Sequence, residues 1–133
     1  MSMELSLNLS KVINIDAHLD VRPLKDNKVH SGSPFRLLLE DKRFTGELVE
    51  FSCQGSQCSR KHADYVLSNG HKILWLSDIK DNIIENFTKL VEKNEDNIFL
   101  SFDIDSIRAS DCPGVSCPST RGISAEDALD ICY

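Results

Sequence analysis

The 133-residue sequence lacks any apolar run that approaches the roughly 20 residues of a membrane-spanning helix. It also lacks a block of basic residues. Its 15 lysines and arginines are outnumbered by 21 aspartates and glutamates, which gives a net charge of −6. An acidic balance without a basic patch argues against a nucleic-acid-binding surface. We therefore expect neither a membrane nor a nucleic acid as a partner.

The first dozen residues have neither a basic start nor a long apolar core, so they do not resemble a secretory signal peptide. The five cysteines are odd in number. The pairs Cys53/Cys58 and Cys112/Cys117 have four residues between them, wider than the commonest zinc-binding spacing. Reduced thiols in a cytoplasmic protein account for this pattern better than disulfides, and a structural zinc is the weaker alternative. We therefore expect a cytoplasmic location.

Internal repeats and low-complexity tracts are absent, and the length suits one domain. Short apolar runs alternate with segments of helical period. We expect strands at residues 11–16, 48–52, 72–76 and 97–103, and helices at residues 35–41, 59–69, 79–93 and from 124 onwards. Ser33, Asp78 and Ser124 are the expected N-caps, and Gly70 the expected C-terminal stop. This alternation predicts a parallel sheet with helices on its faces, and two long loops at 20–34 and 106–123.

The first predicted strand leads into three side chains that are typical metal ligands. Asp16, His18 and Asp20 occupy alternate positions directly after the apolar run at residues 12–15. In an extended backbone, alternate side chains share one face, so the three would point the same way. Carboxylates together with an imidazole suit Mn²⁺, Fe²⁺ or Zn²⁺. Open α/β sheets bind their ligands at this end of the strands.

The last predicted strand ends in the same way. Asp103 and Asp105 follow an apolar run and would share one face, with a spread of roughly 6.5 Å along the strand. That spread could serve two ions about 3.5–4 Å apart, as in two-metal hydrolytic sites. The ordinary alternative is that these acids only cap loops. However, a carboxylate at the end of an apolar strand needs a partner, because removing a charge from water is costly.

Together the two motifs resemble those of the ureohydrolase superfamily, which includes arginase, agmatinase and formimidoylglutamase. The family pattern Asp-Ala-His-x-Asp occurs at residues 16–20 and Ser-x-Asp-x-Asp at residues 101–105. Residues 29–36 look most like the formimidoylglutamase branch. The resemblance implies a three-layer, doubly wound parallel α/β sheet of the arginase type. It also implies two Mn²⁺ ions that activate a shared water, and hydrolysis of linear amidine C–N bonds.

Within that resemblance, formimidoylglutamate is the expected substrate, with glutamate and formamide as products, in histidine catabolism. Agmatinase or arginase activity is one alternative. A truncated, non-catalytic relative that acts through subunit interaction is the other. The family is substantially longer than this chain, and its first metal ligand is a histidine that would precede residue 1. Its substrate-pocket glutamate would follow residue 133.

We therefore expect residues 1–133 to form a single partial arginase-like domain, an internal piece of a longer protein with an incomplete sheet. A strand without its native neighbour leaves an open edge, which favours pairing with another chain. A homo-oligomer is accordingly among the expected states.

The resemblance also implies a role for each metal ligand. Asp16 and Asp103 would bridge the two ions, and His18 and Asp105 would complete the shell of one. Asp20 would serve the other ion. Asp105 would in addition be catalytic, because it would hold the attacking water in line. The metal set is therefore Asp16, His18, Asp20, Asp103 and Asp105.

Two residues of the first long loop complete the predicted site. His30 resembles the family's active-site histidine, which relays protons near the leaving group, although a lone loop histidine is usually just solvated. Arg22 could grip a substrate carboxylate with its planar guanidinium, although a surface arginine needs no such role. Formimidoylglutamate carries two carboxylates and agmatine none, so Arg22 favours the former. We assign no role to His62 or His71.

Overall fold

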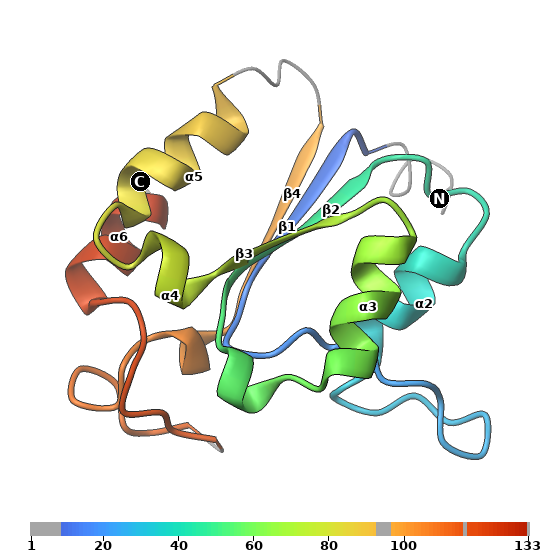
Figure 1. The fold of residues 1–133 in the computed structure, drawn as a ribbon, viewed down its shortest axis with the longest axis horizontal. Coiled ribbons are helices and arrows are strands. Elements are labelled where there is room, and N and C mark those ends of the chain that lie inside the picture. The colour runs from blue at the N-terminus through green and yellow to red at the C-terminus, as the bar shows by residue number, and fades with distance from the viewer. Residues whose placement is uncertain (1–8, 93–96, 116, 133) are drawn as a thin grey trace.

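A parallel four-stranded sheet forms the centre of the computed structural model, which describes residues 9–92, 97–115 and 117–132 (Figure 1). The strands are β1 (Lys11–Ile15), β2 (Glu47–Cys53), β3 (Lys72–Trp75) and β4 (Ile98–Phe102). All neighbouring strands are parallel, in the order β3-β2-β1-β4. The predicted strands are confirmed, with ends that differ by no more than one residue. The order places β1 and β4, the strands that precede the two motifs, side by side.

Helices cover both faces of this sheet. Helices α2 (Pro34–Glu40) and α3 (Arg60–Ser68) lie on one face. Helices α4 (Leu76–Ile79), α5 (Ile83–Val91) and α6 (Ala125–Cys132) lie on the other. This arrangement confirms the three-layer α/β class. Among the described residues, no helix is both long and apolar enough to cross a bilayer.

The strands build two cores because their side chains alternate between the faces. Ile13, Ile15 and Phe51 pack toward α4, α5 and α6, where the Phe51 ring meets the edge of the Phe87 ring at 5.9 Å. Val12 and Leu48 pack toward α2 and α3. Parallel strands that are covered on both faces are mainly apolar, and β1 and β2 are buried along nearly their whole length. The two cores hold the strand ends, and therefore the site, in fixed positions.

The single helix expected at residues 79–93 is wrong. The structure has two helices there, because Asn82 leaves helical geometry at φ −141° and ψ 45°. The one-turn helix α4 buries Leu76 and Ile79 against the sheet, and α5 then continues the apolar period from Ile83. Asp78 lies inside α4 instead of capping a helix. Residue 93, the predicted end, lies outside the described residues.

The other predicted boundaries have mixed outcomes. Gly70 has φ +84°, the left-handed conformation that suits a residue after a helix, so the predicted stop is confirmed. Ser124 is confirmed as an N-cap, since the Asp127 N–H donates to its hydroxyl at 3.0 Å. Ser33 occupies the predicted N-cap position of α2, but its side chain makes no capping hydrogen bond. Its hydroxyl instead donates to the His30 carbonyl at 2.8 Å and accepts from the His30 N–H at 3.1 Å. Ser33 therefore closes the loop that precedes α2.

Candidate metal centre

The carboxyl ends of β1 and β4 bring the two acidic motifs together. Ile15 and Phe102 are partners at the last position of the paired strands. One residue further, the Asp103 N–H donates to the Ile15 carbonyl at 2.8 Å. Asp16 and Asp103 therefore leave the sheet next to each other, at the edge where open α/β sheets bind ligands.

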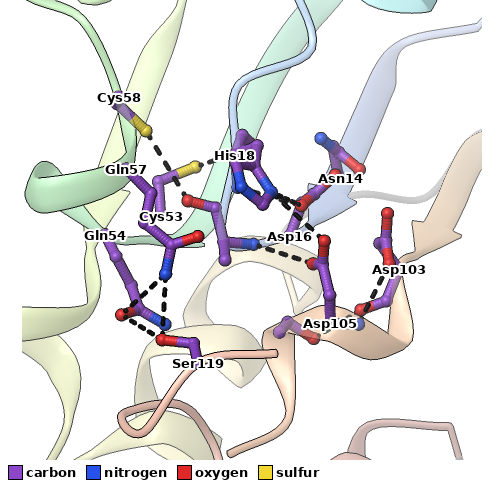
Figure 2. Close-up of polar contacts among 12 residues, drawn as sticks. Asn14, Asp16, His18, Cys53, Gln54, Gln57, Cys58, Asp103, Asp105 and Ser119 are labelled. Carbon is purple, nitrogen blue, oxygen red and sulfur yellow. Dashed lines mark hydrogen bonds and ion pairs between the residues drawn. The ribbon is translucent and has the colours of Figure 1, made fainter. Parts of the chain in front are cut away.

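Five donor side chains form two clusters at this edge. The first contains Asp16, His18 and Asp105, and the second contains Asp16, Asp20 and Asp103. Within each cluster the candidate ligand atoms all lie within 4.8 Å of one another. In the first, His18 Nδ1 lies 3.4 Å from Asp16 Oδ1 and 3.2 Å from Asp105 Oδ2 (Figure 2). Asp16 belongs to both clusters, the position of a bridging ligand, whereas Asp103 belongs to one.

Turns, and not extended strand, create this convergence. β1 ends at Ile15, so the expected alternation along a strand does not extend to Asp16, His18 and Asp20. The Asp16 carboxylate instead accepts from the His18 N–H at 2.9 Å, and Asp20 adopts a left-handed φ of 55°, which aspartate tolerates better than most residues. The expectation that these side chains share one face of a strand was therefore wrong. Their predicted convergence is nevertheless found, because turns bring them together.

A short helical turn plays the same part after β4. Residues Ile104–Ser106 form a 3₁₀ turn, and the Asp103 carboxylate accepts from the Asp105 N–H at 3.0 Å. The turn aims the Asp105 carboxylate back at His18, where Figure 2 shows the contact. Asp103 and Asp105 therefore serve different clusters because of this turn.

The electrostatics of the first cluster indicate a cation site. Asp16 is 1% exposed, and its Oδ2 atom has no hydrogen-bond partner among the described residues. Burial raises the pKa of Asp16 to about 8. Hydrogen bonds to Asp105 and Asp16 raise the pKa of His18 to about 11. Protons thus balance the acidic charge, and a divalent cation could take their place at these hard oxygens and the imidazole nitrogen.

Two of the other acids, Asp20 and Asp105, respond to the same surroundings in opposite ways. Burial raises the pKa of Asp20. Burial, the largest single influence, raises the pKa of Asp105, but hydrogen bonds with His18 and Asp16 and the charge of His18 together outweigh it and lower the pKa. An ionised Asp105 beside a cationic His18 is consistent with a site that is built around positive charge. The donor set therefore fits a divalent ion such as Mn²⁺.

A polar cavity of about 520 Å³ opens next to the clusters. One side is lined by the candidate ligands His18, Asp20, Asp103 and Asp105. The other side is lined by residues of the loop after β1 and of the segment that leads into α3. These are Arg22, Ser31, Gly32, Ser56, Gln57, Cys58, Ser59 and His62. The cavity is large enough for a small-molecule substrate that reaches the metal ligands.

Arg22 lies in this cavity, as a substrate-binding residue requires. The chain brings it there because the Arg22 N–H donates to the Gly32 carbonyl at 2.9 Å. The Arg22 side chain then runs closely past Gly32. A Cβ atom at Gly32 would lie only 2.9 Å from Arg22 Cδ. Glycine at this position therefore makes room for the Arg22 side chain.

His30 is not brought to the clusters. Its Nδ1 accepts from the Gly32 N–H at 3.2 Å, and its Nε2 lies 3.1 Å from the Pro23 carbonyl, to which it can donate. Both ring nitrogens are thus bound to the backbone of their own loop, and His30 does not line the polar cavity. A proton-relay role would require the ring to leave these contacts, and that role stays a prediction.

Sequence reasoning missed a buried amide network beside the cavity. The Gln54 side-chain amide donates to the Arg121 carbonyl at 2.8 Å, and its oxygen accepts from the Ser119 hydroxyl at 3.0 Å. The Gln57 amide in turn donates to the Ser119 hydroxyl at 2.9 Å (Figure 2). The network ties the loop after β2 to the second long loop. The only sequence signal was the position of Gln54 directly after a strand, at the same edge as the metal motifs.

Two thiols support the backbone of the first motif. The Cys53 thiol donates to the His18 carbonyl at 3.5 Å, and the Cys58 thiol donates to the Ala17 carbonyl at 3.6 Å (Figure 2). All five cysteines are free thiols, as the sequence predicted. No cysteine enters a candidate metal cluster within the described part of the chain.

The fold and the two motifs define the class of protein. The sequence model of the arginase family matches residues 6–133, so the chain belongs to the arginase family. This confirms the resemblance that the motifs carried. The chain is similar to formimidoylglutamase of Rhodococcus jostii, with 32% identity over 127 residues that cover 91% of this chain and 39% of that protein.

Solved structures agree with this assignment. Formiminoglutamase of Trypanosoma cruzi, crystallised with Mn²⁺, has a TM-score of 0.86 and 49% identity, over 92% of this chain and 42% of that chain. Formimidoylglutamase of Bacillus subtilis has a TM-score of 0.81 and 26% identity, over 92% of this chain and 40% of that chain. The chain therefore spans about 40% of the length of these relatives.

Proposed function

We propose that this chain carries the metal centre of a manganese-dependent hydrolase of linear amidines, and that its substrate is formimidoylglutamate. The convergence of five donors with Asp16 shared by two clusters carries the proposal. His18 and Asp105 would complete the shell of one ion, and Asp20 and Asp103 that of the other. The relatives named formimidoylglutamase, one of them crystallised with Mn²⁺, support the choice of metal and substrate.

The reaction adds water across the amidine carbon and releases glutamate and formamide. Bound Mn²⁺ ions would supply the Lewis acidity that makes a water molecule nucleophilic at neutral pH. Asp105 lines the cavity, so its carboxylate would orient the attacking water. The water oxygen ends in formamide, and the leaving glutamate nitrogen takes a proton, for which His30 is the predicted relay. This chemistry would place the protein in histidine catabolism, and we expect it in the cytoplasm.

Arg22 supports formimidoylglutamate over agmatine within the same reaction class. Among the described residues, no acidic side chain forms a salt bridge with Arg22, although it lines the cavity of the metal ligands. A free guanidinium at this place would bind a substrate carboxylate through paired N–H donors. Agmatine has no carboxylate to offer.

Comparison of three substrates tests this proposal. The Mn²⁺-loaded protein is incubated with formimidoylglutamate, agmatine or arginine, and the products are quantified. Release of glutamate and formamide from the first alone is expected. Asp16→Asn should abolish turnover, and Asp130→Asn, an exposed acid of α6, should not. Preference for agmatine or arginine would contradict the substrate, and full activity of Asp16→Asn would contradict the site.

The open edge of β4 favours the alternative in which the chain acts through subunit interaction. In the part of the chain that the structure describes, β4 pairs on one side only, with β1. Phe99 is 54% exposed and Leu100 is 37% exposed. An edge strand with exposed apolar side chains can pair with another chain. Sedimentation should then show an oligomer that Phe99→Ser weakens and Leu67→Ser, equally exposed on α3, does not; a monomer would contradict this alternative.

A further inference from the structure

The lining of the polar cavity combines acidic and basic side chains. The candidate ligands contribute the acids Asp20, Asp103 and Asp105. The basic side chains are Arg22, from the loop after β1, and His62, from the first turn of α3. These two side chains come from segments about forty residues apart in sequence, and both line the same cavity. A ligand that contacts both groups of residues has a cationic or metal-binding head and an anionic tail.

His62 is positioned for this task by the start of α3. Its backbone N–H donates to the Ser59 hydroxyl, which caps the helix at 3.1 Å. The His62 ring is half-buried and makes no hydrogen bond to another described residue. The ring therefore keeps its N–H donor for a ligand in the cavity.

The charges around His62 are positive, as in a site that binds an anion. Burial lowers the pKa of His62, and the neighbouring charges of Arg36, Arg22 and Lys61 lower it further. Arg36 is already engaged, since it stacks 3.5 Å over the Tyr65 ring and donates to the Val21 carbonyl at 2.8 Å. Lys61 does not line the cavity, so Arg22 and His62 are the two basic side chains that remain for a ligand there.

We propose that His62 is a specificity-determining residue that, together with Arg22, binds the carboxylate tail of the substrate. The inference rests on the proposed function, since it assumes that the substrate head lies at the metal ligands. The tail of formimidoylglutamate carries two carboxylates, so one can bind the Arg22 guanidinium and the other the His62 N–H. An amine tail, as in agmatine, would meet positive charge and would be rejected.

Calorimetric titration of the protein with L-glutamate tests the inference, with and without Mn²⁺. His62→Ala should raise Kd for glutamate about tenfold, which is the loss expected for one hydrogen bond to a charged group. Lys61→Ala is the matched control: it removes a positive charge from the same helical turn, but Lys61 does not line the cavity. It should change Kd less than twofold. His62→Gln keeps an N–H donor and should recover most of the affinity.

The outcomes separate this inference from the proposed function. Loss of glutamate affinity in His62→Ala but not in Lys61→Ala supports the inference, even in a protein that binds no Mn²⁺ and so contradicts the proposed function. Wild-type affinity in His62→Ala overturns the inference, even where Mn²⁺-dependent hydrolysis upholds the proposed function. If His62→Ala and His62→Gln lose glutamate affinity equally, with unchanged circular dichroism, then a hydrogen bond from His62 is not what binds glutamate, and the inference is overturned. Absence of glutamate binding by the wild-type protein also overturns the inference.

Discussion

Replacement of Glu50 by glutamine should stabilise this protein at neutral pH. Glu50 lies in the middle of β2 with no exposed surface. Its Oε1 accepts from the Asn14 side-chain amide at 2.8 Å, but its Oε2 has no partner among the described residues. Burial raises the pKa of Glu50 well above its usual value. The folded protein therefore holds this carboxyl group neutral, whereas the unfolded chain ionises it at an ordinary pH.

The sign and size of the effect follow from these two states. Below the usual pKa of 4.5, Glu50 is protonated in both the folded and the unfolded state, so its ionisation does not change the folding stability. As pH rises above that value, the unfolded chain loses the proton first, so folding stability falls by about 1.4 kcal/mol per pH unit until the folded pKa is reached. Glutamine does not titrate and escapes this loss.

Urea denaturation of the metal-free protein at three pH values between about 4 and 6 checks this reasoning. The stability of Glu50→Gln relative to wild type should rise with pH above 4.5, by about 1.4 kcal/mol per pH unit. Glu92→Gln, an exposed acid beyond α5, is the matched control and should show no such trend. The reasoning would be refuted if the difference in unfolding free energy between Glu50→Gln and wild type stayed constant or decreased as pH rises.

Three further substitutions test the cavity and its support. In the Mn²⁺-loaded protein, Arg22→Ala should raise KM for formimidoylglutamate by the equivalent of about 1.5–3 kcal/mol, and an unchanged KM would rule out its role. Gly32→Ala should also raise KM, because its Cβ would lie 2.9 Å from Arg22 Cδ, whereas Gly55→Ala meets nothing within 4 Å and should not. Gln54→Leu leaves the buried Ser119 hydroxyl without its acceptor, so it should lower the free energy of unfolding by about 1–3 kcal/mol. An unchanged urea midpoint would contradict that expectation.

The strands and both metal motifs could be predicted because local sequence determines them. A buried parallel strand reads as a short apolar run, as residues 12–15 do. Residues 98–100 are also apolar, although Phe99 and Leu100 are exposed at the edge of the sheet. The acids that end these runs had to meet once the two strands were neighbours in a parallel sheet. The predicted order of elements therefore placed Asp16 and Asp103 at the same edge of the sheet.

Other features depend on contacts that local sequence does not contain. The apolar period alone suggests one helix, but the chain breaks at Asn82 between α4 and α5, and Leu76, Ile79 and Ile83 join the same core. His62 reaches the cavity only because α3 begins beside the loop that carries Arg22, far away in the sequence. Such pairings become visible only in the folded chain.

Titration of the folded protein with Mn²⁺ tests the central claim most directly. The cluster of Asp16, His18 and Asp105 contains an imidazole, whereas that of Asp16, Asp20 and Asp103 contains carboxylates alone. Nitrogen donors raise affinity for first-row divalent ions, so the clusters should be unequal. Electron paramagnetic resonance and calorimetry should therefore show about one tightly bound Mn²⁺ and a second bound weakly or not at all. Two equal tight sites would contradict this difference between the clusters, and no binding by a chain shown to be folded would contradict the metal centre itself.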